Sequence, residues 1–199
     1  MVITDPDLIK GRDPVSVCRA AVRGGATMIQ VRWKDGNPAD VVELARALVA
    51  ALPVPILVND RADIALAAGA AGAHLGWEDV PLAPLPPHLP DGFLLGISVG
   101  SADEATRAGG LPADYWSVGP CFPTPTKPDA GSALGPEGFA SIVRLAPEGM
   151  PVMGIGGITA ANATAIITAG AAGVAVIGAV MSAQDPESAA RAVAVAVHA

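Results

Sequence analysis

A loop rich in proline, threonine and lysine follows one short apolar run of the sequence. The run extends from Tyr115 to Val118, and the loop, from Gly119 to Gly131, reads GPCFPTPTKPDAG. Its prolines fix φ and remove backbone donors, which excludes a helix or a central strand. The loop presents Thr124, Thr126 and Lys127, whose hydroxyl and ammonium donors suit phosphate oxygens. A rigid surface connection with a solvated lysine explains the local pattern equally well.

Three polar side chains, those of Gln30, Arg32 and Lys34, alternate along the end of another apolar run. A period of two sends all three to one side of an extended segment. A strand end that frays into solvent is the alternative interpretation. The chain has only three lysines, Lys10, Lys34 and Lys127, and its net charge is −7. Because an acidic protein that binds an anion must concentrate its positive charge locally, this placement favours an anion site.

Two aspartates follow strands that are neighbours along the chain. Asn59 and Asp60 end one buried run, and Asp79 comes shortly after the next. Two carboxylates with phosphate oxygens and water form a typical Mg²⁺ site. The alternative for Asn59 and Asp60 is a helix N-cap, where both residue types are common. His74 lies within its strand and has no metal-spaced partner, so we expect it to be structural.

Glycine-rich junctions follow two later strands. The run from Gly154 to Gly157 leads into a helix, and Ile177 and Gly178 open a short turn. Glycine-rich junctions after the last two strands of a barrel form a common phosphate cradle. Ser98 ends another predicted strand, so its hydroxyl is expected at the same edge.

Eight strand-like runs position these residues, each followed by a helix or by a segment that replaces one. The predicted strands cover 2–4, 27–32, 55–58, 72–75, 94–98, 115–118, 152–155 and 173–177. The predicted helices cover 14–23, 38–52, 61–68, 101–108, 136–146, 160–169 and 185–197. This alternation implies parallel strands with crossover helices, and eight units favour an α/β fold of the (β/α)8 TIM-barrel type. An open doubly wound sheet is disfavoured because no G-x-G-x-x-G follows the first strand.

The composition excludes several classes of protein. A length of 199 residues suits one domain with a large core, here residues 1–199. An acidic chain without a basic block argues against nucleic-acid binding. No apolar run reaches the ~18 residues of a membrane span, and the N-terminus lacks a signal-peptide pattern. Cys18 and Cys121 are interpreted as free thiols, so we expect a cytoplasmic location.

Six motifs are spread over nearly the full length of the chain: GGATMIQVRWK, VNDRADIALAAGAAGAHLGWED, GISVG, DYWSVGPCFPTPTKPDAG, MGIGGIT and GVAVIGAV. Together they resemble the thiamine phosphate synthase family. The resemblance implies a (β/α)8-barrel transferase that joins a pyrimidinylmethyl pyrophosphate to a thiazole phosphate and releases pyrophosphate. The two substrates are the expected small-molecule partners, and a homo-oligomer is left open.

The resemblance also implies roles for residues that match the family's motifs. The pyrimidine pyrophosphate would be held by Gln30, Arg32, Lys34, Asn59, Ser98 and Lys127. Asp60 and Asp79 would bind the Mg²⁺ cofactor. The thiazole phosphate would be bound by Thr124, Thr126, Gly157, Ile177 and Gly178. Pyrophosphate leaves first in the family's mechanism, so catalysis is assigned to cations that stabilise the leaving group, Arg32 and Lys127, together with Ser98.

Four positions depart from the family's pattern. Trp33 and Trp77 stand where an acidic residue and a glutamine are usual, and Gly178 replaces a common serine. Gly100 stands where a histidine is associated with the related thiazole tautomerase group, which argues against that alternative. A non-catalytic barrel that binds phosphate or thiamine is a second alternative. A barrel isomerase is a third, but it would need a general base that the sequence does not offer.

Overall fold

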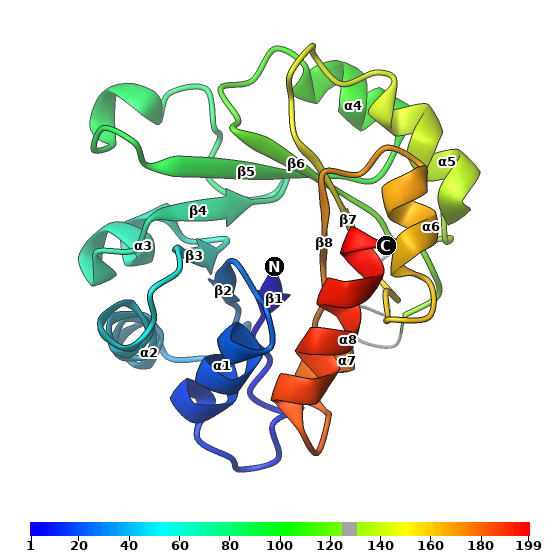
Figure 1. Cartoon of the computed structure of the whole chain (residues 1–199). Coiled ribbons are helices and arrows are strands. Elements are labelled where there is room, and N and C mark those ends of the chain that lie inside the picture. The colour runs from blue at the N-terminus through cyan, green and yellow to red at the C-terminus, as the bar shows by residue number, and fades with distance from the viewer. Residues whose placement is uncertain (125–130) are drawn as a thin grey trace.

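The chain folds into a ring of eight parallel strands with helices around its outside (Figure 1). The computed structural model describes residues 1–124 and 131–199. Each strand pairs with the next in sequence order. A parallel bridge between Val2 and Val176 joins the last strand to the first. This closure confirms the predicted (β/α)8 barrel and contradicts the doubly wound alternative.

The elements agree closely with the predicted ranges. The strands are β1 (Val2–Ile3), β2 (Ile29–Val31), β3 (Ile56–Asn59), β4 (Gly72–Leu75), β5 (Leu94–Val99), β6 (Tyr115–Val118), β7 (Val152–Ile155) and β8 (Gly173–Ala175). The α-helices are α1 (Pro14–Arg23), α2 (Pro38–Ala51), α3 (Ala62–Ala68), α4 (Ala102–Ala108), α5 (Gly135–Val143), α6 (Ala163–Thr168), α7 (Gly178–Met181) and α8 (Pro186–His198). A short 3-10 helix, η1 (Pro86–His88), lies between β4 and β5.

Three helix starts follow directly from caps in the sequence. The side chain of Asp13 accepts a hydrogen bond from the Ser16 backbone at the start of α1. Asn37 caps α2 and Asp185 caps α8 in the same way, and each cap precedes a proline in the first turn. Such a cap typically contributes about 1 kcal/mol. The starts of these three helices are therefore encoded locally.

Several boundaries differ from the sequence prediction by up to three residues, and two of these differences have a local cause. The segment at Ile177 was expected to finish a strand and open a turn, but β8 ends at Ala175 and α7 follows. The Ile177 carbonyl accepts from the amides of Val180 and Met181, so helical hydrogen bonds replace the turn. Helix α6 begins later than expected because Asn162 forms a local turn with Thr159.

The first and last long helices, α1 and α8, pack side by side and cover the junction of β8 with β1 (Figure 1). Gly24 permits this approach, because a Cβ there would lie 2.8 Å from the Cβ of Ala190. With the ring closed, all eight strands end at the same mouth, where the loops that follow them meet.

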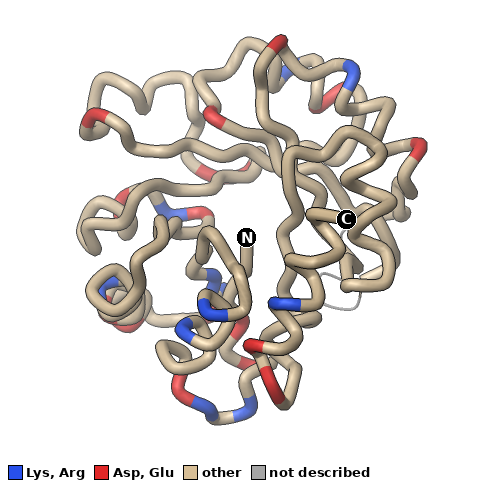
Figure 2. Tube along the Cα trace, viewed as in Figure 1, with Lys and Arg blue, Asp and Glu red and all other residues tan. Residues whose placement is uncertain are grey.

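Acidic and basic segments are interspersed around the outside of the chain in the view of Figure 2. In the part of the chain that the structure describes, no helix combines the length and apolar character needed to cross a membrane. Both cysteines are buried free thiols, as expected. Burial raises the pKa of Cys18 to about 12 and that of Cys121 to about 11, so neither is a reactive thiolate at neutral pH.

Candidate active site

A cavity of about 890 Å³ is lined by residues at or just after the carboxyl ends of the strands. Every predicted site residue within the described ranges lines it: Gln30, Arg32, Lys34, Asn59, Asp60, Asp79, Ser98, Thr124, Gly157, Ile177 and Gly178. Thr126 and Lys127 lie outside the described residues. The structure thus gathers the candidates at one mouth, while their individual roles stay predictions.

The basic wall of the cavity is held by the end of β1. Nη1 of Arg32 lies 3.3 Å from Oδ2 of Asp5, and both side chains are mostly buried. The Arg32 amide donates to the Thr4 hydroxyl at 2.9 Å, and that hydroxyl donates to the Arg32 carbonyl at 3.1 Å. Lys34 lines the same wall. The sequence analysis missed Thr4 and Asp5, although their place after the first apolar run was a usable signal.

The acidic wall consists of Asp60 and Asp79, which follow β3 and β4. Burial raises the pKa of Asp60, and the neighbouring carboxylate of Asp79 raises it further. Lys34 and Arg32 lower that pKa by smaller amounts, which places the cations close to the carboxylates. The two carboxylates therefore meet as a pair whose repulsion a bound cation would offset.

This pair fits a Mg²⁺ ion. Within residues 1–124 and 131–199, no group of three or more histidine, cysteine and acidic side chains gathers around a common point. Mg²⁺ usually takes one or two carboxylates and completes its shell with water and substrate phosphates. The two aspartates supply that number, and the remaining ligands would come from substrate and water.

The helix-cap alternative for Asn59 and Asp60 is wrong. Arg61 immediately precedes α3, and no side chain caps this helix. Asp60 instead adopts a left-handed backbone with φ of 64°, and its amide donates to the His74 carbonyl at 2.7 Å. A non-glycine residue in this region is uncommon and is often held there for function. The local geometry turns the Asp60 carboxylate into the cavity rather than onto a helix end.

His74 is buried, as expected, but it also contacts a predicted site residue. Its Nδ1 lies 3.0 Å from the Tyr115 hydroxyl, and its Nε2 lies 3.0 Å from Oγ of Ser98. Burial lowers the pKa of His74 to about 4, so the imidazole is neutral at physiological pH. The histidine therefore connects the barrel interior to the floor of the cavity.

The glycine junction after β7 lies against the loop that follows β6. Gly156 and Gly157 have φ of 90° and 65°, and a Cβ on Gly157 would lie 2.6 Å from the Pro123 carbonyl. Only glycine fits this conformation and this contact. Ser182, at the end of α7, also lines the cavity and donates to the Gly178 carbonyl at 2.6 Å. The sequence analysis missed Ser182, because it lies well beyond the glycine motif.

Three of the four unusual positions, Trp77, Gly100 and Gly178, line the cavity, and Trp33 does not. Trp77 lines it, and the guanidinium carbon of Arg107 lies 4.3 Å from the Trp77 ring centroid. Gly100 also lines it, and its amide donates to a carboxylate oxygen of Glu104 at 2.6 Å. Trp33 is 37% exposed and does not line the cavity. The indole of Trp77 is thus the departure that changes the inner surface.

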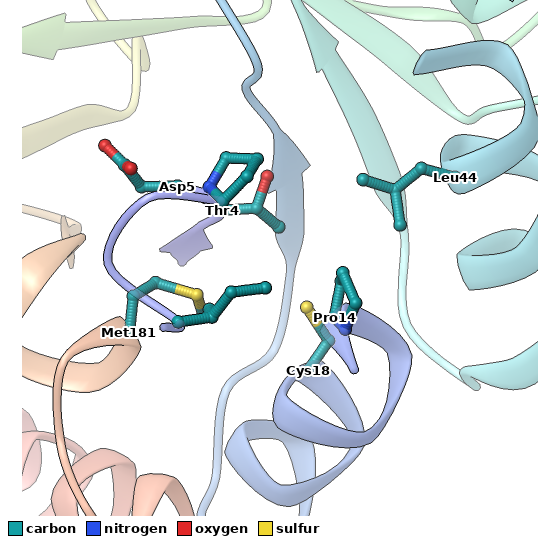
Figure 3. Close-up of a pocket in the computed structure, with 8 residues that line it drawn as sticks. Thr4, Asp5, Pro14, Cys18, Leu44 and Met181 are labelled. Atoms are coloured by element: carbon teal, nitrogen blue, oxygen red, sulfur yellow. The ribbon is translucent and has the colours of Figure 1, made fainter. Parts of the chain in front are cut away.

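A second, much smaller cavity of about 10 Å³ lies below Asp5. It is lined mainly by apolar groups and by the sulfurs of Cys18 and Met181, and Figure 3 shows the Asp5 carboxylate turned away from both sulfurs. Its volume is about that of one water molecule, so it is a packing gap and not a ligand site.

A closed (β/α)8 barrel with a polar cavity at the carboxyl ends of its strands defines the class of barrel enzymes that carry their active site at this end. The family profile described as thiamine monophosphate synthase matches residues 1–180. The chain belongs to this family.

Individual relatives agree with this assignment. The chain is 46% identical over 194 residues to a thiamine-phosphate synthase from Roseiflexus sp. strain RS-1, covering 96% of this chain and 81% of the relative. It is 43% identical over 193 residues to a thiamine-phosphate synthase from Chloroflexus aurantiacus, covering 96% and 88%. The solved structure of a thiamine phosphate pyrophosphorylase from Pyrococcus furiosus matches with a TM-score of 0.89 at 37% identity, over 99% of this chain and 94% of the other.

These findings confirm the predicted family and the prediction of a transferase enzyme. They also favour the main functional prediction over the tautomerase and the non-catalytic alternatives. More distant matches, such as an orotidine 5'-phosphate decarboxylase from Pyrococcus horikoshii at 18% identity and a TM-score of 0.74, support the barrel fold alone.

Proposed function

We propose that this chain couples 4-amino-2-methyl-5-hydroxymethylpyrimidine diphosphate with hydroxyethylthiazole phosphate, giving thiamine phosphate and pyrophosphate in a Mg²⁺-dependent reaction. The observation that carries the proposal is the pairing of two carboxylates, Asp60 and Asp79, with Arg32 and Lys34 on one cavity. The two carboxylates suit the metal ion of a metal diphosphate, and the two cations suit its phosphate oxygens. A neutral or cationic ligand would leave the two cations without a partner.

The reaction needs stabilisation of a departing diphosphate rather than a protein nucleophile. Arg32 and Lys34 line the cavity, and they would bind the oxygens on which negative charge grows as the C–O bond to pyrophosphate breaks. Lys127, in the loop beyond Thr124, would add a third cation. Mg²⁺ held by Asp60 and Asp79 would supply further neutralisation of the leaving group. The thiazole nitrogen then forms the new C–N bond with the pyrimidinylmethyl cation.

The second substrate would bind on the opposite side of the mouth. Gly157 and Gly178 bring backbone close to the cavity without a side chain in the way, which suits the phosphate of the thiazole. Thr124 lines the same region. Both substrates are small phosphate esters, and a cytoplasmic location accords with such a biosynthetic role.

The deciding assay measures thiamine phosphate from the two substrates, with and without Mg²⁺. We expect product only when Mg²⁺ is present, and loss of turnover by at least about a hundredfold in Asp79→Ala. Asp91→Ala removes an exposed carboxylate in the loop before β5, so it is the matched control and should retain turnover. A folded wild-type protein that forms no product would overturn the proposed function, and full activity of Asp79→Ala would overturn the metal assignment.

A further inference from the structure

Ser98 is connected to the barrel interior by a chain of hydrogen bonds across three strands. The imidazole of His74 on β4 contacts Ser98 on β5 through Nε2 at 3.0 Å. Its Nδ1 contacts the hydroxyl of Tyr115 on β6, also at 3.0 Å. A predicted substrate-binding residue, Ser98, is thus connected to two buried residues that the mechanism above does not use.

The barrel register brings these groups together. Gly96 pairs with His74 on one side and with Tyr115 on the other, so all three lie at one level of the barrel. A Cβ on Gly96 would collide with the Tyr115 phenol and would lie 2.5 Å from Nδ1 of His74. The missing side chain lets the two rings meet across β5, with centroids 5.5 Å apart and planes at 27°.

The direction of the hydrogen bonds follows from the groups available. The Tyr115 hydroxyl is buried, so its proton needs an acceptor, and among the described residues its hydrogen-bond partner is Nδ1 of His74. The phenol proton is therefore donated to Nδ1 of His74. A neutral imidazole that accepts at Nδ1 carries its proton on Nε2. Nε2–H therefore donates to Oγ of Ser98.

We infer that Tyr115 and His74 are positioning residues that hold Ser98 as a hydrogen-bond donor toward the pyrimidine diphosphate. Because Oγ of Ser98 accepts from the imidazole, its own proton is directed to an acceptor in the cavity. The opposite tautomer would turn the Ser98 proton toward His74 and would remove this donor from the substrate. The inference rests on the proposed function for the identity of the ligand, but the direction of the chain is a property of the protein alone.

The first test is independent of catalysis. Nitrogen-15 NMR of the wild-type protein should show His74 as a neutral ring protonated at Nε2 and unprotonated at Nδ1. His88 and His198 are both exposed, and the signals that disappear in His74→Gln are those of His74. A ring protonated at Nδ1 would overturn the inference, whether or not the protein makes thiamine phosphate.

The second test is a double-mutant cycle on kcat/KM for the pyrimidine diphosphate. Tyr115→Phe should lower this ratio about tenfold in the wild-type background, and by less than about twofold in a Ser98→Ala background. In a Lys34→Ala background, which leaves the chain of hydrogen bonds intact, the tenfold effect of Tyr115→Phe should persist. Equal effects in the Ser98→Ala and Lys34→Ala backgrounds would mean that Tyr115 acts only through general packing and would refute the relay.

Discussion

Arg32 and Asp5 form an ion pair at the edge of the cavity, with 3.3 Å between Nη1 and Oδ2. The pair orients the guanidinium but also neutralises part of the charge that an anionic ligand would meet. Asp5→Asn should therefore tighten inhibition by pyrophosphate about threefold, since a single ion pair at the edge of a solvated cavity contributes up to about 1 kcal/mol. Asp7→Asn removes the same charge from an exposed neighbour and should leave the inhibition constant unchanged. Weaker inhibition in Asp5→Asn would show that orientation outweighs charge.

Asp60 and Asp79 oppose each other's charge when no cation is bound. Asp79→Asn keeps an acceptor for the Gly76 amide, which the native carboxylate binds at 2.7 Å, and removes the repulsion. We expect its Tm without Mg²⁺ to rise by about 2–4 °C, the shift for about 1 kcal/mol in a chain of this size. Its Tm should no longer increase on addition of Mg²⁺. A Mg²⁺-dependent increase equal to that of the wild type would count against these ligands.

Burial of His74 makes stability depend on pH. Its pKa is about 4 in the folded protein against 6.5 ordinarily, so below pH 6.5 the unfolded chain binds a proton that the folded chain does not. Stability must therefore fall as the pH falls from 6.5 toward 4, by about 2 kcal/mol between pH 7 and pH 5 for this group. The free energy of unfolding of His74→Gln, measured with denaturant at each pH, should lack this part of the pH dependence. His88→Gln, which changes an exposed histidine, should retain the full slope.

Trp77 presents an aromatic surface to the cavity and is supported by Arg107. Both proposed substrates contain flat heterocycles, and contact between aromatic rings is worth about 1 kcal/mol beyond area burial. Trp77→Leu should raise KM for one substrate about fivefold and should keep kcat within about twofold of the wild-type value. Steady-state kinetics with each substrate varied in turn would identify which ring lies against the indole. Trp33→Leu, outside the cavity, is the control and should change neither constant.

The alternation of strands and helices was predictable because its signals are local. Caps such as Asp13 and Asp185, and glycine stops such as Gly69, act on the backbone within a few residues of their own position. The edge at which the site forms was also predictable, because parallel strands in a barrel all end at one mouth. The sequence was less informative at Ile177, where helical hydrogen bonds override a pattern that continues a strand.

The sequence by itself determined the eight repeating units, their order and most of the residues that reach the mouth. Only the tertiary structure decided which of those residues touch: Arg32 with Asp5, Asp60 with Asp79, and His74 with both Tyr115 and Ser98. The members of each pair lie 19 to 41 positions apart in the chain. Their contact depends on strand register and on the space left by Gly96, and neither of these can be read from local pattern or propensity.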